Sequence, residues 1–81
     1  MTDITTEKLL KIGELAKETG ETVATIRFWT TEGILHFSAR TPGRYRLYDR
    51  SSIDRVKLIQ KFKKEQRLTI PEIRERLANN G

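Results

Sequence analysis

The sequence contains no cysteine. A disulfide framework, a thiolate metal site, a cysteine nucleophile and thiol-based redox sensing are therefore excluded from this segment, and stability must come from packing alone. The sequence also lacks any apolar run long enough to cross a membrane. Residues 1–10 mix charged residues with threonines and do not form the apolar centre of a secretory signal. We therefore expect a cytoplasmic protein without a membrane partner.

Histidine is almost absent as well. His36, the single histidine, falls in an expected loop, and no nucleophile or carboxylate is spaced to work with it. The chain has neither a Walker sequence nor a Gly-x-Gly-x-x-Gly fingerprint. These absences leave no candidate catalytic residue, metal ligand or cofactor site, and we predict that the chain is not an enzyme.

Positive charge is what the sequence has in excess. The 81 residues, enough for one small domain, carry a formal net charge of +5. Residues 40–67 hold ten Lys or Arg against three acidic residues, whereas residues 1–39 hold four against six. This segregation predicts a basic face for the phosphates of nucleic acid, and a merely solvated surface is the alternative.

Two short helices are expected between residues 12 and 33. Apolar residues recur at helical spacing in both, and Gly20 and Gly33 are placed to end them. Thr22 can serve as the N-cap of the second helix. Two such helices, separated by a glycine turn and each with one apolar stripe, predict a helix-turn-helix. The stripes are Ile12, Leu15 and Ala16, followed by Val23, Ile26 and Trp29.

A short β-hairpin, or wing, is expected next. Residues 40–43 (Arg-Thr-Pro-Gly) have turn chemistry, and residues 44–48 alternate large side chains of β-compatible types. On such a strand, Arg44 and Arg46 would lie on one side and Tyr45 on the other.

Two further helices complete the predicted fold. Asp49 is the expected N-cap of a helix from about Arg50 to Glu65. Residues 69–72 (Thr-Ile-Pro-Glu) form a capping box with proline in the first turn, which opens a fourth helix ending near Asn79. The apolar stripes are Ile53, Val56, Ile59 and Phe62 in the third helix, and Ile73 and Leu77 in the fourth.

The start of the second helix is the candidate DNA-reading segment, because the major groove admits a helix and displays distinguishable base edges. With the apolar stripe inward, Ala24, Arg27, Phe28 and Thr31 lie on the opposite side. Arg27 is the candidate for a guanine edge or a phosphate, with a solvated charge as the alternative. Ala24, and Val23 from the edge of that face, can contact a thymine methyl, but small apolar residues are too common to decide this.

The aromatic residues favour packing over nucleotide stacking. One adjacent pair, Phe28 and Trp29, is not a stacking platform for single strands. Trp29 is expected in the core, and Phe28 under the wing or against the sugar–phosphate edge. Tyr48 is expected to pack with its hydroxyl at the rim of the core.

Two groups of basic residues are candidates for contacts to the DNA backbone. Arg44 and Arg46 can reach a phosphate or the minor groove from the wing. Lys63 and Lys64 can reach phosphates from the third helix, although a lysine-rich helix face is also explained by solvation alone.

Four segments in register resemble the DNA-binding domain of the MerR-family transcription regulators. They are residues 11–16 (KIGELA), 25–35 (TIRFWTTEGIL), 45–49 (YRLYD) and 70–73 (IPEI). The resemblance runs from about Leu10 to Leu77, and its order and spacing make it specific. It implies a mainly α fold with a small β-hairpin, a winged helix-turn-helix of about four helices over residues 11–79, after a flexible extension at residues 1–10.

The resemblance also implies sequence-specific binding to double-stranded DNA for transcriptional regulation. In this family a long C-terminal helix forms the homodimer, and RNA polymerase engages the bound promoter; neither that helix nor an effector domain is present here. A homodimer is thus expected only if such a helix exists beyond this chain. The residues that the resemblance assigns to DNA are Thr22, Val23, Ala24, Thr25 and Arg27 in the recognition helix, Arg44, Tyr45 and Arg46 in the wing, and Lys63 and Lys64 in a second wing.

The sequence departs from the family at two places. Phe28-Trp29 replaces a tyrosine-rich pair and removes its hydroxyls, and Arg67 stands where the family has glycine in the turn between the last helices. Two other functions are compatible with the same residues. One is a small phage or plasmid architectural factor of the excisionase or packaging type, and the other is a protein-interaction module that has lost DNA binding.

Overall fold

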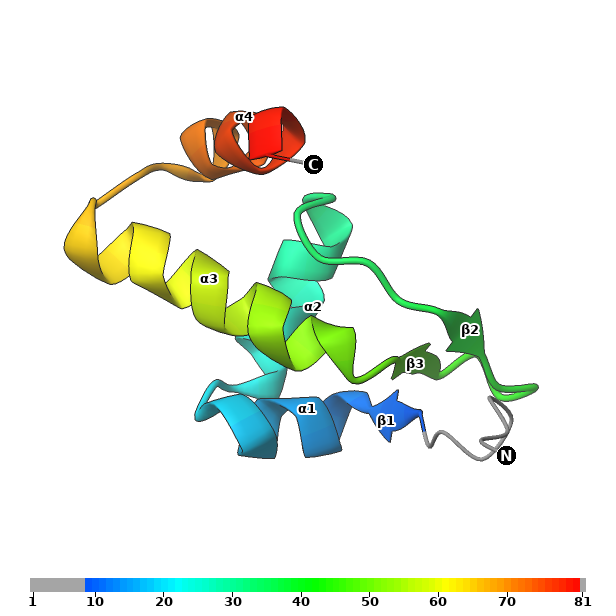
Figure 1. Cartoon of the computed structure of the whole chain (residues 1–81). Coiled ribbons are helices and arrows are strands. Elements are labelled where there is room, and N and C mark those ends of the chain that lie inside the picture. The colour runs from blue at the N-terminus through cyan, green and yellow to red at the C-terminus, as the bar shows by residue number, and fades with distance from the viewer. Residues whose placement is uncertain (1–8, 81) are drawn as a thin grey trace, which may run out of the picture.

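The computed structural model describes residues 9–80. In Figure 1 the long third helix crosses the molecule, with α1 on one side of it and α4 on the other, and the strands lie near its start. The predicted mainly α fold with a small sheet is confirmed. The elements are β1 (Leu10–Lys11), α1 (Ile12–Thr19), α2 (Val23–Thr31), β2 (Ala39–Arg40), β3 (Arg46–Tyr48), α3 (Ser51–Glu65) and α4 (Ile70–Asn80).

The helix-turn-helix forms as predicted. Gly20 ends α1 in the left-handed region at φ 74°, a conformation that costs a residue with a Cβ but not glycine. Thr22 then caps α2 by accepting the backbone N–H of Thr25 at Oγ1, 3.1 Å away. The side chain of Gln60 on α3 donates to the carbonyl of Thr19 at 3.0 Å, which ties this turn to the rest of the domain.

The sheet has one more strand than predicted. Its order is β1-β3-β2, with both pairs antiparallel. Leu10 lies opposite Tyr48 and is 6% exposed. The folded region therefore includes Leu10, which we had assigned to the N-terminal extension, and residues 1–8 of that extension lie outside the described residues.

The wing differs from the prediction at Arg44. Residues 44–48 do not form one strand, because Arg44 has φ 72° and β3 begins only at Arg46. The N–H of Arg44 donates to the carbonyl of Thr41 at 2.8 Å, and the N–H of Thr41 donates to the carbonyl of Tyr45 at 2.9 Å. This is a turn closed by a left-handed residue, which is usually glycine. Arg44 and Arg46 therefore do not alternate on one strand.

One apolar core joins all the helices. The side chains of Leu15, Ile26, Val56, Ile59 and Ile73 are fully buried, and each stabilises the fold by about 1.5–3 kcal/mol relative to exposure. Trp29 is 2% exposed, which confirms it as a core residue. The predicted inward stripes of α3 and α4 are confirmed at Val56, Ile59, Phe62, Ile73 and Leu77, and Ile53 is half-buried.

Tyr48 also differs from the expectation. It is 0% exposed, and its hydroxyl lies 2.8 Å from Oγ1 of Thr30. The hydroxyl is therefore buried and not at the rim of the core, because Thr30 of α2 supplies a polar partner there.

The starts of α3 and α4 are both held by side chains. The structure makes Arg50 the residue that precedes α3, one position later than the predicted N-cap Asp49. Asp49 nevertheless accepts the N–H of Ser51 at 2.9 Å. For α4 the predicted capping box is confirmed, since Glu72 accepts the N–H of Thr69 at 2.8 Å and Thr69 Oγ1 accepts that of Glu72 at 3.3 Å.

Candidate nucleic-acid interface

The exposed face of α2 carries the residues that the sequence assigned to it. Ala24, Arg27, Phe28 and Thr31 are all exposed, and Val23 is half-buried at the edge. The Thr22 hydroxyl also donates to Thr25 Oγ1 at 2.9 Å, so these two side chains order the first turn of the helix. The face is thus regular, open and mostly uncharged around one arginine.

Arginines from two separate elements meet beside this face. Arg27 of α2 and three wing arginines line a hollow of about 330 Å³, together with Ile12 and Tyr45. None of these lining residues is acidic. In the described part of the chain the one ion pair joins Arg74 to Glu32, so none of these four arginines forms an ion pair with a described carboxylate. The wing arginines are Arg40, Arg44 and Arg46.

Two of these arginines lie directly opposite each other. Arg40 of β2 pairs with Arg46 of β3, and residues paired in this way point to the same face of the sheet. Both guanidinium groups lie over the ring of Phe37, at 5.0 Å and 5.4 Å from its centroid. Like charges at directly opposed positions repel, and here an aromatic face lies beside both of them.

Arg40 and Phe37 are not among the residues that the sequence predicts for this interface. Arg40 falls in the expected turn, and no sequence pattern assigns a role to Phe37. The pairing of Arg40 with Arg46 follows from the left-handed residue at position 44, which adds one residue to the turn. The available signal was the Arg-Thr-Pro-Gly-Arg run, because a type I turn with proline at its second position is often followed by a left-handed residue.

Lys63 and Lys64 do not join this cluster. They are exposed in the last turn of α3, and Figure 1 shows the turn between α3 and α4 at the opposite end of the molecule from the β2–β3 hairpin. Arg67 lies in that turn with φ 54°. Each of the two turns therefore has an arginine in the left-handed region, and α2 lies between them.

Large apolar side chains are exposed next to the arginines. Among the described residues these are Phe28, which is 49% exposed, and Tyr45, which is 72% exposed. Phe28 is thus not covered by the wing, which leaves the sugar–phosphate edge as its expected contact. Exposed aromatic groups beside unpaired arginines are typical of a surface that binds a partner.

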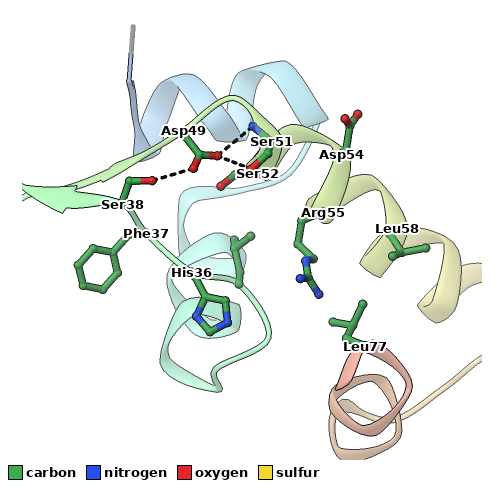
Figure 2. Close-up of a pocket in the computed structure, with 11 residues that line it drawn as sticks. His36, Phe37, Ser38, Asp49, Ser51, Ser52, Asp54, Arg55, Leu58 and Leu77 are labelled. Atoms are coloured by element: carbon green, nitrogen blue, oxygen red, sulfur yellow. Dashed lines mark hydrogen bonds between the residues drawn. The ribbon is translucent and has the colours of Figure 1, made fainter. Parts of the chain in front are cut away.

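A second hollow of about 430 Å³ has a different character. It lies between residues 35–38, the start of α3 and Leu77 of α4, and it is lined by two carboxylates and one arginine. Figure 2 shows Asp49 at its edge, accepting hydrogen bonds from Ser38 and Ser51. The hydrogen bond from the Ser51 side chain, followed by that from Ser38, holds the pKa of Asp49 below its ordinary value of 3.8. This hollow does not have the uniform positive charge that a phosphate requires.

Residues 9–80 contain no candidate metal site, because no group of three or more His, Asp or Glu side chains is placed there to hold a metal ion. None of the helices in that range combines the length and apolar character that a membrane crossing requires.

A family model described as "MerR HTH family regulatory protein" matches residues 10–80. The chain belongs to the MerR HTH family. The relatives of known sequence include the nodulation protein NolA of Bradyrhizobium elkanii, which is 43% identical over 80% of this chain and 29% of its own length. The HTH-type transcriptional regulator CueR of Bacillus subtilis is 38% identical over 95% of this chain and 52% of its own length.

Solved MerR-family structures have the same fold. The transcription regulator PbrR691 of Ralstonia metallidurans, in complex with lead(II), superimposes with a TM-score of 0.77 at 37% identity, over 88% of this chain and 55% of that one. HiNmlR, a MerR-family regulator that lacks the sensor domain and is bound to promoter DNA, superimposes with a TM-score of 0.73 at 20% identity. The match covers 84% of this chain and 53% of HiNmlR. The chain thus spans about a third to a half of the MerR-family proteins it matches.

Proposed function

We propose that this chain binds double-stranded DNA with sequence preference, as the DNA-binding unit of a transcriptional regulator. The observation that carries the proposal is the hollow beside the exposed face of α2, which is lined by four arginines and no acidic residue. A helix fits the major groove, and arginines on either side of it fit the flanking phosphates. HiNmlR, which shares this fold, is bound to promoter DNA.

The proposed contacts divide between bases and backbone. The first turns of α2 face the base edges, where Val23 and Ala24 meet apolar groups and Arg27 takes a guanine edge or the nearest phosphate. Thr22 and Thr25 keep their capping bond and offer hydroxyl oxygens at the rim. The backbone contacts are Arg40, Arg44, Tyr45 and Arg46 from the wing, and Phe28 against the sugar edge.

A second backbone contact is proposed at the turn between α3 and α4. Lys63, Lys64 and Arg67 lie at or next to this turn, and all three are exposed. A helix C-terminus favours positive charge by itself, so a structural role accounts for the two lysines in part. Arg67 adopts a left-handed backbone, which costs stability for a residue with a Cβ. Stability therefore does not account for an arginine at this position, which favours a role in binding.

The test is a mobility-shift titration of this chain against a short mixed-sequence duplex at several salt concentrations. The affinity should fall steeply with salt, and Arg27→Ala should lower the affinity and reduce the salt slope by about one. Arg55→Ala is the matched control, because Arg55 lines the other hollow, and it should bind as the parent does. An affinity that does not respond to salt would overturn the proposal.

A selection from random duplexes separates regulation from other uses of the fold. A regulator should enrich one sequence, and substitution of Ala24 should change the enriched bases. CueR, PbrR691 and HiNmlR are regulators by name, and the architectural factor is therefore not favoured. The resemblance to the family implies a homodimer and contact with RNA polymerase, and we propose both only for a longer form of this protein.

A further inference from the structure

Phe37 lies two residues before β2, and it is half-buried with its ring against the apolar core. The core side of the ring is fixed by that packing. The guanidinium groups of Arg40 and Arg46 both lie over this ring, at 5.0 Å and 5.4 Å from its centroid, within the range at which a cation is attracted to an aromatic face. One ring that packs against the core therefore lies within cation–π range of two arginine side chains.

The two arginines need such a partner. They are directly paired across β2 and β3, so their charges repel each other on the same face of the sheet. The alternation of β3 turns Arg46 toward the same side as the buried Tyr48, which brings both guanidinium groups toward α2 and Arg27. Left without the ring, each side chain would reduce the repulsion by swinging away from the other.

A cation–π contact leaves the guanidinium groups able to bind. The attraction to the ring involves the charge of the group and uses none of its five N–H donors as a hydrogen bond. Two arginines held near one ring therefore keep their donors available for the oxygens of a DNA backbone.

We propose that Phe37 is a positioning residue for DNA binding, which holds Arg40 and Arg46 together toward the sugar–phosphate backbone. The proposal rests on the DNA binding proposed above. It adds Phe37 to the residues proposed to serve DNA binding, and it gives Arg40, one of the proposed backbone contacts, a defined aromatic partner. It also explains why an apolar ring next to the wing remains partly open to solvent.

The test compares Phe37→Leu, which keeps the apolar volume, with Phe37→Tyr, which keeps the aromatic face. Binding to the same mixed-sequence duplex should weaken about fivefold in Phe37→Leu and stay near the parent value in Phe37→Tyr. In an Arg40→Ala, Arg46→Ala background, Phe37→Leu should have no further effect on the affinity. A loss in that background as large as in the parent would mean that Phe37 acts only through folding, and the proposal would fail.

A second measurement does not depend on any variant. Protons on Cδ of Arg40 and Arg46 should show upfield NMR shifts caused by the Phe37 ring current, and ordinary positions for both would overturn the proposal. If the parent chain itself bound no duplex, the proposed function would fail. If it bound and Phe37→Leu bound equally well, only the role of Phe37 would fail.

Discussion

Tyr48 of β3 donates its phenolic proton to Oγ1 of Thr30 on α2. The two oxygens are 2.8 Å apart. The Thr30 hydroxyl donates its one proton to the carbonyl of Ile26, also at 2.8 Å, so the Tyr48 hydroxyl must be the donor between the two. The bond joins β3, at the base of the wing, to α2, the helix that carries Arg27.

This bond should respond differently to the loss of its two ends. Tyr48→Phe removes the donor and leaves no unsatisfied proton, so we expect a loss of about 1 kcal/mol in the free energy of unfolding. Thr30→Val leaves the buried Tyr48 hydroxyl without an acceptor and should cost about 2 kcal/mol. Urea denaturation of both variants measures the difference.

The double variant Tyr48→Phe, Thr30→Val provides the control. It removes the orphaned donor together with its partner, so it should be more stable than Thr30→Val alone. Equal effects of the two single substitutions, or simple additivity in the double, would contradict the assigned direction of the bond.

Arg44→Gly should make the domain more stable and its DNA complex weaker. Arg44 has φ 72°, a conformation that costs a residue with a Cβ about 1 kcal/mol and glycine almost nothing. The unfolding free energy should therefore rise by about that amount. Arg44→Ala is the matched control, because it keeps the Cβ: its stability should stay near that of the parent, while it loses as much DNA affinity as Arg44→Gly. Stability that falls in the glycine variant would refute the account of the turn.

Arg67→Gly tests the second proposed wing in the same manner. Arg67 has φ 54°, and the next residue, Leu68, donates its N–H to the carbonyl of Phe62 at 3.2 Å to close the turn. We expect a gain of about 1 kcal/mol in stability and a salt slope of DNA binding that is smaller by about one. A gain in stability with no change in the slope would mean that this turn does not touch DNA.

Acid should weaken the junction between the wing and α3. Hydrogen bonds from Ser51 and Ser38 lower the pKa of Asp49 below 3.8, so the folded state binds this proton less readily than the unfolded state does. The resulting stability is complete above the ordinary pKa and is lost as pH falls through the lowered one. Asp49→Asn should therefore flatten the acid limb of a stability–pH curve. Glu72, whose pKa is also lowered, first by the Thr69 backbone N–H, should account for part of the acid dependence that remains in that variant.

The Asp49 prediction can be checked in the cavity shown in Figure 2. Ser38→Ala removes one of the two hydroxyl donors without changing the carboxylate, and it should remove part of the same pH dependence. An acid limb that is identical in Asp49→Asn and the parent would assign the dependence to other carboxylates.

Local chemistry by itself determined most of the fold. Helix starts and stops depend on residues within one turn, and those at Gly20, Thr22 and the box of Thr69 and Glu72 were all predictable. The inward stripe of α2 followed from spacing alone, and with it the exposed face that holds Ala24 and Arg27. Four motifs in register were enough to indicate the family.

Only the tertiary structure decided how the wing meets that face. The left-handed backbone of Arg44 accompanies the register that pairs Arg40 with Arg46; the turn residues before it only favour this conformation, and the pairing itself shows that it is adopted. The place of Phe37 under both arginines, the third strand at Leu10 and the buried hydroxyl of Tyr48 depend on contacts between distant segments. Sequence periodicity records which side of an element is buried, but the neighbour that covers it is chosen by packing in three dimensions.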